Sequence, residues 1–253
     1  PPVFSRVVAM NQDWTGIGTG DGAFPLTRLT LLRRVREESP DARKEALGVL
    51  WKAYWKPLYA YARHLKLSNE AAKDLVQSFC AWATEGDLLA RFDPSLGRLR
   101  TWLRACFHSF FLTTLKGERA GKRGGGKALL PVEEAMEVPS AERAGSEFDR
   151  AWALGLIERA FGRWKEELSK RPEDRWRLDL VSLLQADGFG KLPAHADLAT
   201  RLGVSETRVR HFVQRDSKQR LKEEILLEVR EGSSGEAEAR EELDYLLRCV
   251  AQP

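Results

Sequence analysis

A run of side chains between positions 205 and 218 is suited to hydrogen bonding with nucleic acid. Guanidinium and amide groups pair with base edges in a major groove, and cations pair with phosphates. Their spacing places them on one face of a helix, opposite an apolar stripe of Val209, Phe212 and Val213. The side chains that we predict to contact DNA in this way are Ser205, Thr207, Arg208, Arg210, His211, Gln214, Arg215 and Lys218.

The residues before this run predict a second helix and a tight turn. Leu198, Ala199 and Leu202 form a small, apolar stripe at helical spacing. Gly203 can take the left-handed conformation that ends a helix, and Ser205 is a typical N-cap for the next one. The segment therefore predicts a helix-turn-helix. The alternative is an ordinary helical hairpin with a solvated basic face.

Composition excludes several other classes of protein. The chain has 253 residues, a formal net charge of +4 and no apolar run that could span a bilayer. Its three cysteines are scattered, which argues against a disulfide framework or a zinc site. We find no catalytic or metal-binding motif and no cofactor signature, so we do not expect an enzyme. A Cys–His pair brought together by folding stays open, because such partners can lie far apart in sequence.

The order of patterns along the chain predicts an all-α protein with two helical domains. Residues 1–23 read as a flexible leader, and residues 24–116 as a helical domain with a break at Pro57. The glycine-rich stretch 117–147 reads as a long flexible linker. Residues 148–232 contain the helix-turn-helix, and an acidic extension, 233–253, follows.

A second basic, aromatic stretch lies at the end of the first domain. A helix that starts near Leu99 carries several cations beside Trp102 and a group of phenylalanines. Cations next to exposed aromatic rings suit single strands, whose unstacked bases can lie on a ring. The alternative is that these rings belong to the core.

The chain resembles the extracytoplasmic-function, or group IV, sigma factors of bacterial RNA polymerase, especially a planctomycete-like subgroup. The segments AYWKPLYAYAR, AAKDLVQSFCAWA and RFDPSLGRLRTWL are similar to sigma region 2, and DLATRLGVSETRVRHFVQRDSKQRL is similar to region 4. The opening FPLTR, the linker start KRGGG and the ending EELDYLL are similar to the subgroup. The resemblance runs from about Phe24 to the C-terminus.

For the first domain, the resemblance implies contact with the polymerase and with the −10 promoter element. Asp74 and Gln77 of the DLVQ motif would face the clamp helices of the largest polymerase subunit. The alternative is a solvated face, with Asp74 paired to Lys73 or to nearby arginines. The loop 91–98 would capture a flipped base. The −10 DNA contacts that the resemblance implies are Arg98, Arg100, Thr101, Trp102, Arg104, His108, Lys116 and Arg119. The family often has an asparagine in the segment that corresponds to TWLRACFHSFF, where this chain has His108 and Ser109. The identity of the captured base therefore stays open.

For the second domain, the resemblance implies that the helix from Ser205 reads the −35 element and that the domain packs on the flap of the second-largest subunit. Arg208 and Arg210 would contact bases, whereas Arg215, Lys218 and Arg220 would contact phosphates. The acidic part of the linker (Glu133, Glu134 and Glu137) would run through the polymerase.

The resemblance implies a cytoplasmic, nucleoid-associated bacterial protein. The acidic C-terminal extension is a candidate for self-inhibition, in which it folds over the basic face of the second domain and competes with DNA. The alternative is that it forms an ordinary helix pair that caps the domain. The sequence does not tell whether an anti-sigma factor exists. The alternative function is a stand-alone helix-turn-helix regulator that binds DNA without polymerase.

Overall fold

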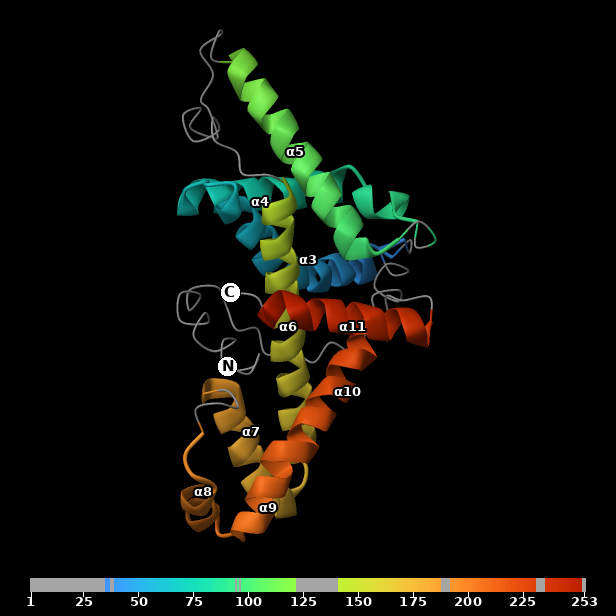
Figure 1. Ribbon diagram of the computed structural model, residues 1–253. Helices are drawn as coiled ribbons and strands as arrows, with labels where there is room; N and C mark the ends of the chain where they lie inside the picture. Colours follow the sequence, from blue (N-terminus) through green and yellow to red (C-terminus); the bar gives the residue numbers. More distant parts are fainter. Residues whose placement is uncertain are drawn as a thin grey trace. The chain divides into compact units, whose positions relative to one another are not determined.

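The computed structural model describes residues 35–36, 39–93, 95, 97–121, 141–187, 192–230 and 235–251. Every regular element in these ranges is helical, which confirms the all-α prediction (Figure 1). The chain divides into two compact units, with a boundary between Trp152 and Ala153. The predicted leader, the FPLTR opening and the acidic linker residues lie outside the described residues. No helix in the described ranges is long and apolar enough to cross a membrane.

The first unit is built from α3 (Pro40–His64), α4 (Asn69–Glu85), the short η2 (Leu88–Arg91), α5 (Leu99–Gly121) and the first turns of α6 (Ala141–Ser169). Its core is aromatic: Phe79 of α4 meets Phe107 of α5 edge-on, with the ring centroids 5.0 Å apart. The side chain of Ser68 caps α4 by accepting a hydrogen bond from the Ala71 N–H (3.2 Å), as its sequence position predicts.

The predicted break at Pro57 is wrong, because α3 continues through it. A proline in a helix interior removes one backbone hydrogen bond and costs roughly 3 kcal/mol. Pro57 is buried here, and its neighbours Tyr54, Leu58 and Tyr61 are at most 1% exposed. Burial of this face along the whole helix offsets the local cost, and burial depends on partners that the local sequence does not reveal.

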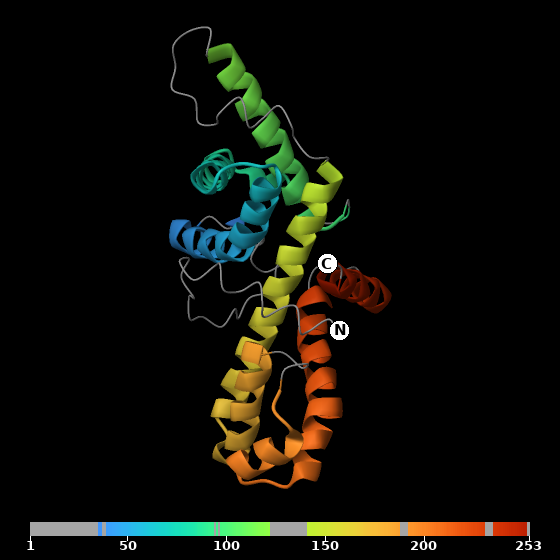
Figure 2. The same ribbon diagram turned by 60° about the vertical axis from the view of Figure 1, so that its left-hand side comes forward.

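The second unit begins at Ala153 within α6 and continues through η5 (Pro172–Asp174), α7 (Arg175–Asp187), α8 (His195–Leu202) and α9 (Glu206–His211). A π-helical turn, η6 (Phe212–Asp216), joins α9 to α10 (Ser217–Arg230), and α11 (Glu236–Ala251) follows. Figures 1 and 2 show α11 at the opposite end of α10 from α9. Leu243, Leu246 and Val250 of α11 are buried.

The boundary between the units lies inside a helix, which differs from the predicted domain limits. The sequence placed a linker over residues 117–147, yet α5 extends to Gly121 and α6 begins at Ala141. Residues 141–152 of α6 belong to the first unit. Glycine and proline content marked residues 117–147 as a linker. Ala144, near the end of that stretch, and Phe148, directly after it, are both fully buried, and their burial holds this part of α6 in the first unit.

Candidate nucleic-acid interface

The helix-turn-helix prediction is confirmed in its backbone and core. Gly203 ends α8 with a φ of 66°, in the left-handed region that favours glycine. The Ser205 side chain caps α9 by accepting a hydrogen bond from the Arg208 N–H. Ala199 of α8 and Val209 of α9 are both buried. These local features fix the angle at which α9 leaves the turn, and with it the direction of the polar face.

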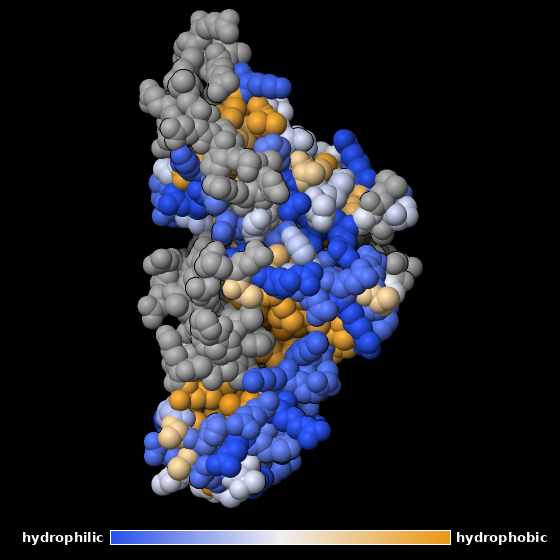
Figure 3. Space-filling model, viewed as in Figure 1, coloured by the Kyte–Doolittle hydropathy of each residue, from blue (hydrophilic) through white to orange (hydrophobic). Residues whose placement is uncertain are grey.

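The polar face of α9 and the following turn is exposed, and the surface over α9 and α10 is largely hydrophilic (Figure 3). Arg210 forms an ion pair with Glu206 one turn earlier, so part of its charge is neutralised within the helix. The predicted −35 contacts that are exposed are Ser205, Thr207, Arg208, Arg210, His211, Gln214, Arg215 and Lys218.

The π-helical turn in the middle of this face is a feature that sequence reasoning missed. Residues 212–216 form it, and the Nδ1 atom of His211 lies 3.1 Å from an Asp216 carboxylate oxygen, five positions further on. Such turns are concentrated at functional sites because they change the rotational phase of the residues that follow. Here the turn changes the direction of Arg215 and Lys218 relative to Arg208.

Trp176 of α7 also contributes to this face and was not predicted. The Cζ atom of Arg208 lies over its indole ring, 5.0 Å from the centroid. The same ring contacts Phe212 edge-on at 5.4 Å. The sequence signal was weak, since Trp176 lies between two arginines about thirty positions before Arg208, and only folding brings the two together.

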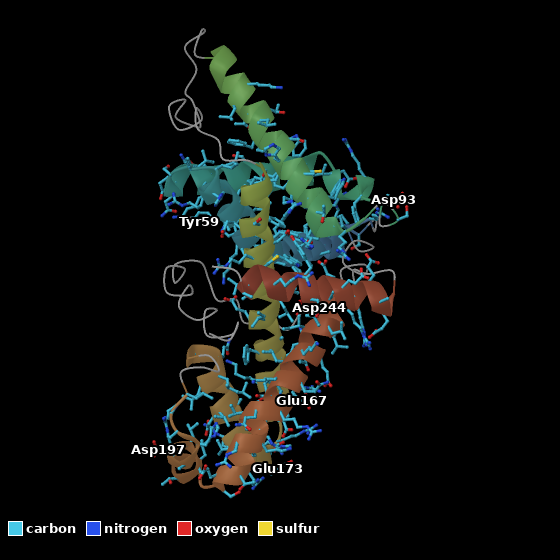
Figure 4. The ribbon with its side chains drawn as sticks, in the orientation of Figure 1. Tyr59, Asp93, Glu167, Glu173, Asp197 and Asp244 are labelled. Carbon is cyan, nitrogen blue, oxygen red and sulfur yellow. The ribbon has the colours of Figure 1, made fainter. Side chains whose placement is uncertain are left out.

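Arg220, a predicted phosphate contact, is directed toward α6 instead. It lies 2.7 Å from Glu224 and also pairs with Glu167, which Figure 4 labels. Arg159 and Arg163 of α6 form further ion pairs with Glu224 and Glu228 of α10. These pairs join α6 to α10, the helix that follows the helix-turn-helix.

In the first unit, Arg100 and Arg104 are not placed on an exposed DNA face. Arg100 is 4% exposed and forms an ion pair with Asp149, which is 2% exposed. Arg104 pairs with the other oxygen of the same carboxylate at 3.0 Å and also donates to the Gly145 carbonyl. A Cβ atom at Gly145 would lie 3.0 Å from the Arg104 guanidinium, so α6 approaches α5 closely here. In this conformation, the two arginines hold α6 against α5 and are not available to a phosphate.

The other predicted −10 contacts have varied environments. Thr101 and Lys116 are exposed, Arg98 is half-buried, and Arg119 lies in α5 with its side chain outside the described residues. Trp102 is half-buried against Phe92, with ring centroids 5.3 Å apart. The Nδ1 atom of His108 lies 2.8 Å from the Tyr61 hydroxyl. Burial raises the pKa of Tyr61 above its ordinary value, and the nearby charge of Arg104 offsets this only in part.

The loop 91–98, the predicted site of a captured base, contains a tight local turn. The Asp93 carboxylate accepts hydrogen bonds from the N–H (2.9 Å) and the hydroxyl (2.7 Å) of Ser95. These bonds hold the pKa of Asp93, labelled in Figure 4, below its ordinary value. Pro94 and Leu96 lie outside the described residues, so the loop is defined only in part.

The predicted polymerase contacts, Asp74 and Gln77, are both exposed on α4. Lys73 pairs with Glu70 at 3.5 Å. A solvated face stays the alternative prediction for Asp74 and Gln77. Burial raises the pKa of the Cys80 thiol, on the same helix, to about 12. A thiol that stays protonated near neutral pH is a poor nucleophile.

Among the described residues, no cluster of three or more potential ligand side chains forms a metal site. Comparison of the chain with protein-family models, with curated proteins and with solved structures gave no match.

Proposed function

We propose that the chain is a sigma factor that binds bacterial RNA polymerase core and directs promoter-specific initiation. The first unit would correspond to sigma region 2 and the second unit to region 4. The observation that carries this proposal is the helix-turn-helix of α8 and α9, with its left-handed turn glycine, its serine cap and an exposed polar, cationic face. That arrangement suits a helix that enters a major groove.

The exposed face of α4 supports the polymerase part of the proposal. Asp74 and Gln77 lie three positions apart on one side of the helix, and both side chains are exposed. The DLVQ motif resembles part of region 2, and this resemblance implies that the two residues contact the clamp helices of the polymerase. A stable complex with polymerase core would also explain how a DNA-reading helix of modest affinity acts, because tethering raises its effective concentration at the promoter.

Transcription in vitro with core polymerase and the full chain tests the proposal. We expect discrete start sites on genomic fragments, and an active core that yields none would contradict a sigma function. Asp74→Asn combined with Gln77→Ala should abolish core binding in a pull-down assay. Asp244→Asn is the matched control, because it removes an exposed charge in α11 (Figure 4) and should leave core binding intact.

One observation favours a second candidate function, a stand-alone DNA-binding regulator. Arg100 and Arg104, the cations expected to hold −10 DNA, are engaged by Asp149. A regulator would use the α9 face alone and would bind an operator duplex without polymerase. Two results together would favour the regulator. The chain would not bind core polymerase, and its affinity for the operator duplex would be the same with and without core.

A further inference from the structure

Trp176 and Arg208 link the core of the second unit to the exposed face of α9. Arg208 is exposed, whereas Trp176, in the first turn of α7, is 8% exposed. The Arg208 guanidinium carbon lies 5.0 Å from the indole centroid, over the ring. A guanidinium at this distance is attracted to the electron-rich face of an indole. The contact therefore restricts a long side chain that solvent would otherwise leave free.

The indole ring is itself held firmly. Phe212 packs edge-on against it at 5.4 Å, and Trp164 packs on Phe212 at 5.7 Å. Arg177 lies 5.2 Å from the ring centroid and pairs with the buried Asp174. The indole N–H is buried with no hydrogen-bond partner among the described residues. Leaving such a donor unpaired costs about 1–3 kcal/mol. The ring contacts, and not its polar atom, therefore set its position.

Arg208 and Arg210 lie on the same helix but are held in different ways. Arg210 donates to the Glu206 carboxylate, which occupies a donor and neutralises charge. Within the described part of the chain Arg208 has no ion pair, and an attraction to a ring face needs no hydrogen-bond acceptor. Its N–H donors remain available in the planar fork that matches the N7 and O6 atoms of guanine.

We propose that Trp176 is a positioning residue that determines sequence specificity. Its ring holds the Arg208 guanidinium ready for a bidentate base contact, although Trp176 itself lies outside the helix-turn-helix. Preorganisation of this kind lowers the entropy lost when the contact forms. The inference rests on DNA reading by α9, the part that both candidate functions share.

The test measures base-pair preference with the full chain at low salt. Duplexes selected from a random pool by the wild-type chain supply a preferred sequence, and each base pair is then changed in turn. We expect Arg208→Ala to lose roughly ten- to a hundredfold discrimination at one base pair. Trp176→Leu should lose about two- to fivefold at the same base pair and little at the others.

A double-mutant cycle separates positioning from general damage. If the ring acts through Arg208, Trp176→Leu should have no further effect on preference in an Arg208→Ala background. Additive effects would overturn the inference. Arg177→Gln is the matched control, because it removes the other guanidinium beside the ring and should leave the preference unchanged.

Trp176→Phe keeps the inference testable if Trp176→Leu fails to fold. Phenylalanine retains a ring, removes the unpaired N–H and attracts a cation less strongly. We expect an unchanged or higher melting temperature together with weaker discrimination at the Arg208 base pair. Full discrimination in a stably folded Trp176→Phe chain would overturn the inference. A wild-type chain that selects no sequence, either alone or together with polymerase core, would overturn DNA reading itself, and this inference with it.

Discussion

The two helices predicted to contact DNA, α5 and α9, carry arginines that the structure treats in opposite ways. On α5, Arg100 and Arg104 are directed toward the Asp149 carboxylate of α6. On α9, Arg208 remains exposed over an aromatic ring. A carboxylate neutralises a guanidinium and occupies its donors, whereas a ring restricts it and leaves the donors available. The neighbour, and not the arginine, therefore decides which cation can meet a phosphate or a base.

The largest effect that tests this comparison is expected at Asp149. Asp149→Ala would remove the carboxylate that pairs with the buried Arg100, so the first unit should lose about 3–5 kcal/mol of unfolding free energy. Urea unfolding measures the loss. Glu147→Ala is the control, because it removes a less buried acid from the same turns of α6 and should cost far less. A stable Asp149→Ala chain that gains affinity for single-stranded DNA would show that these arginines can act as a DNA face.

A smaller effect is expected at Glu228, which joins α10 to α6 behind the α9 face. Burial raises its pKa, but the ion pairs with Arg159 and Arg163 outweigh burial, so its pKa lies below the ordinary value of 4.5. Because the folded-state pKa is the lower one, the stabilisation is fully present above about pH 4.5 and is lost as pH falls through the folded-state value.

Glu228→Gln should therefore lower stability by about 2 kcal/mol at neutral pH, since it weakens charge-assisted hydrogen bonds. The difference from the wild-type chain should shrink in acid. Thermal unfolding between pH 3 and pH 7, as approximate limits, measures both quantities. A difference that stays constant across this range would contradict the role of the Glu228 charge.

The turn that directs the α9 face gives a third test. Gly203→Ala places a side chain at a φ of 66° and should cost about 1–2 kcal/mol. Nothing lies within 4 Å of the position of the added Cβ atom, so the loss would come from the backbone alone. Gly162→Ala, in an exposed helical position with equally open space, is the control and should not destabilise the chain. Equal melting temperatures for the two variants would contradict this explanation.

The smallest effect is expected at Glu206 and sharpens the comparison within α9. Glu206→Gln would release Arg210 from its ion pair and should cost about 0.3–0.5 kcal/mol of stability. DNA affinity should rise, because a neutralising charge leaves the face that we propose contacts phosphates. Fluorescence anisotropy with a duplex at two salt concentrations measures the change. An unchanged affinity would mean that Arg210 does not contact DNA.

Much of the α9 region was predictable, because its signals are local. The turn at Gly203, the cap at Ser205 and the buried Val209 follow from the conformational preference and polarity of each residue. The π-helical turn was not predictable in this way, since nothing in residues 212–216 departs from an ordinary helical pattern. Arg100 and Arg104 of α5 were predicted to contact DNA, because nothing in the neighbouring sequence indicates that they pair with Asp149, which lies 49 and 45 positions later.

By itself, the sequence determined the helical class, the helix-turn-helix and the face of α9 that carries the polar side chains. Only the tertiary structure decided that α3 runs through Pro57, that residues 141–152 belong to the first unit and that Trp176 lies beneath Arg208. The physical reason is one of range. Backbone preference and periodicity act over one or two helical turns, whereas the burial and pairing of a charge depend on residues that folding brings from elsewhere in the chain.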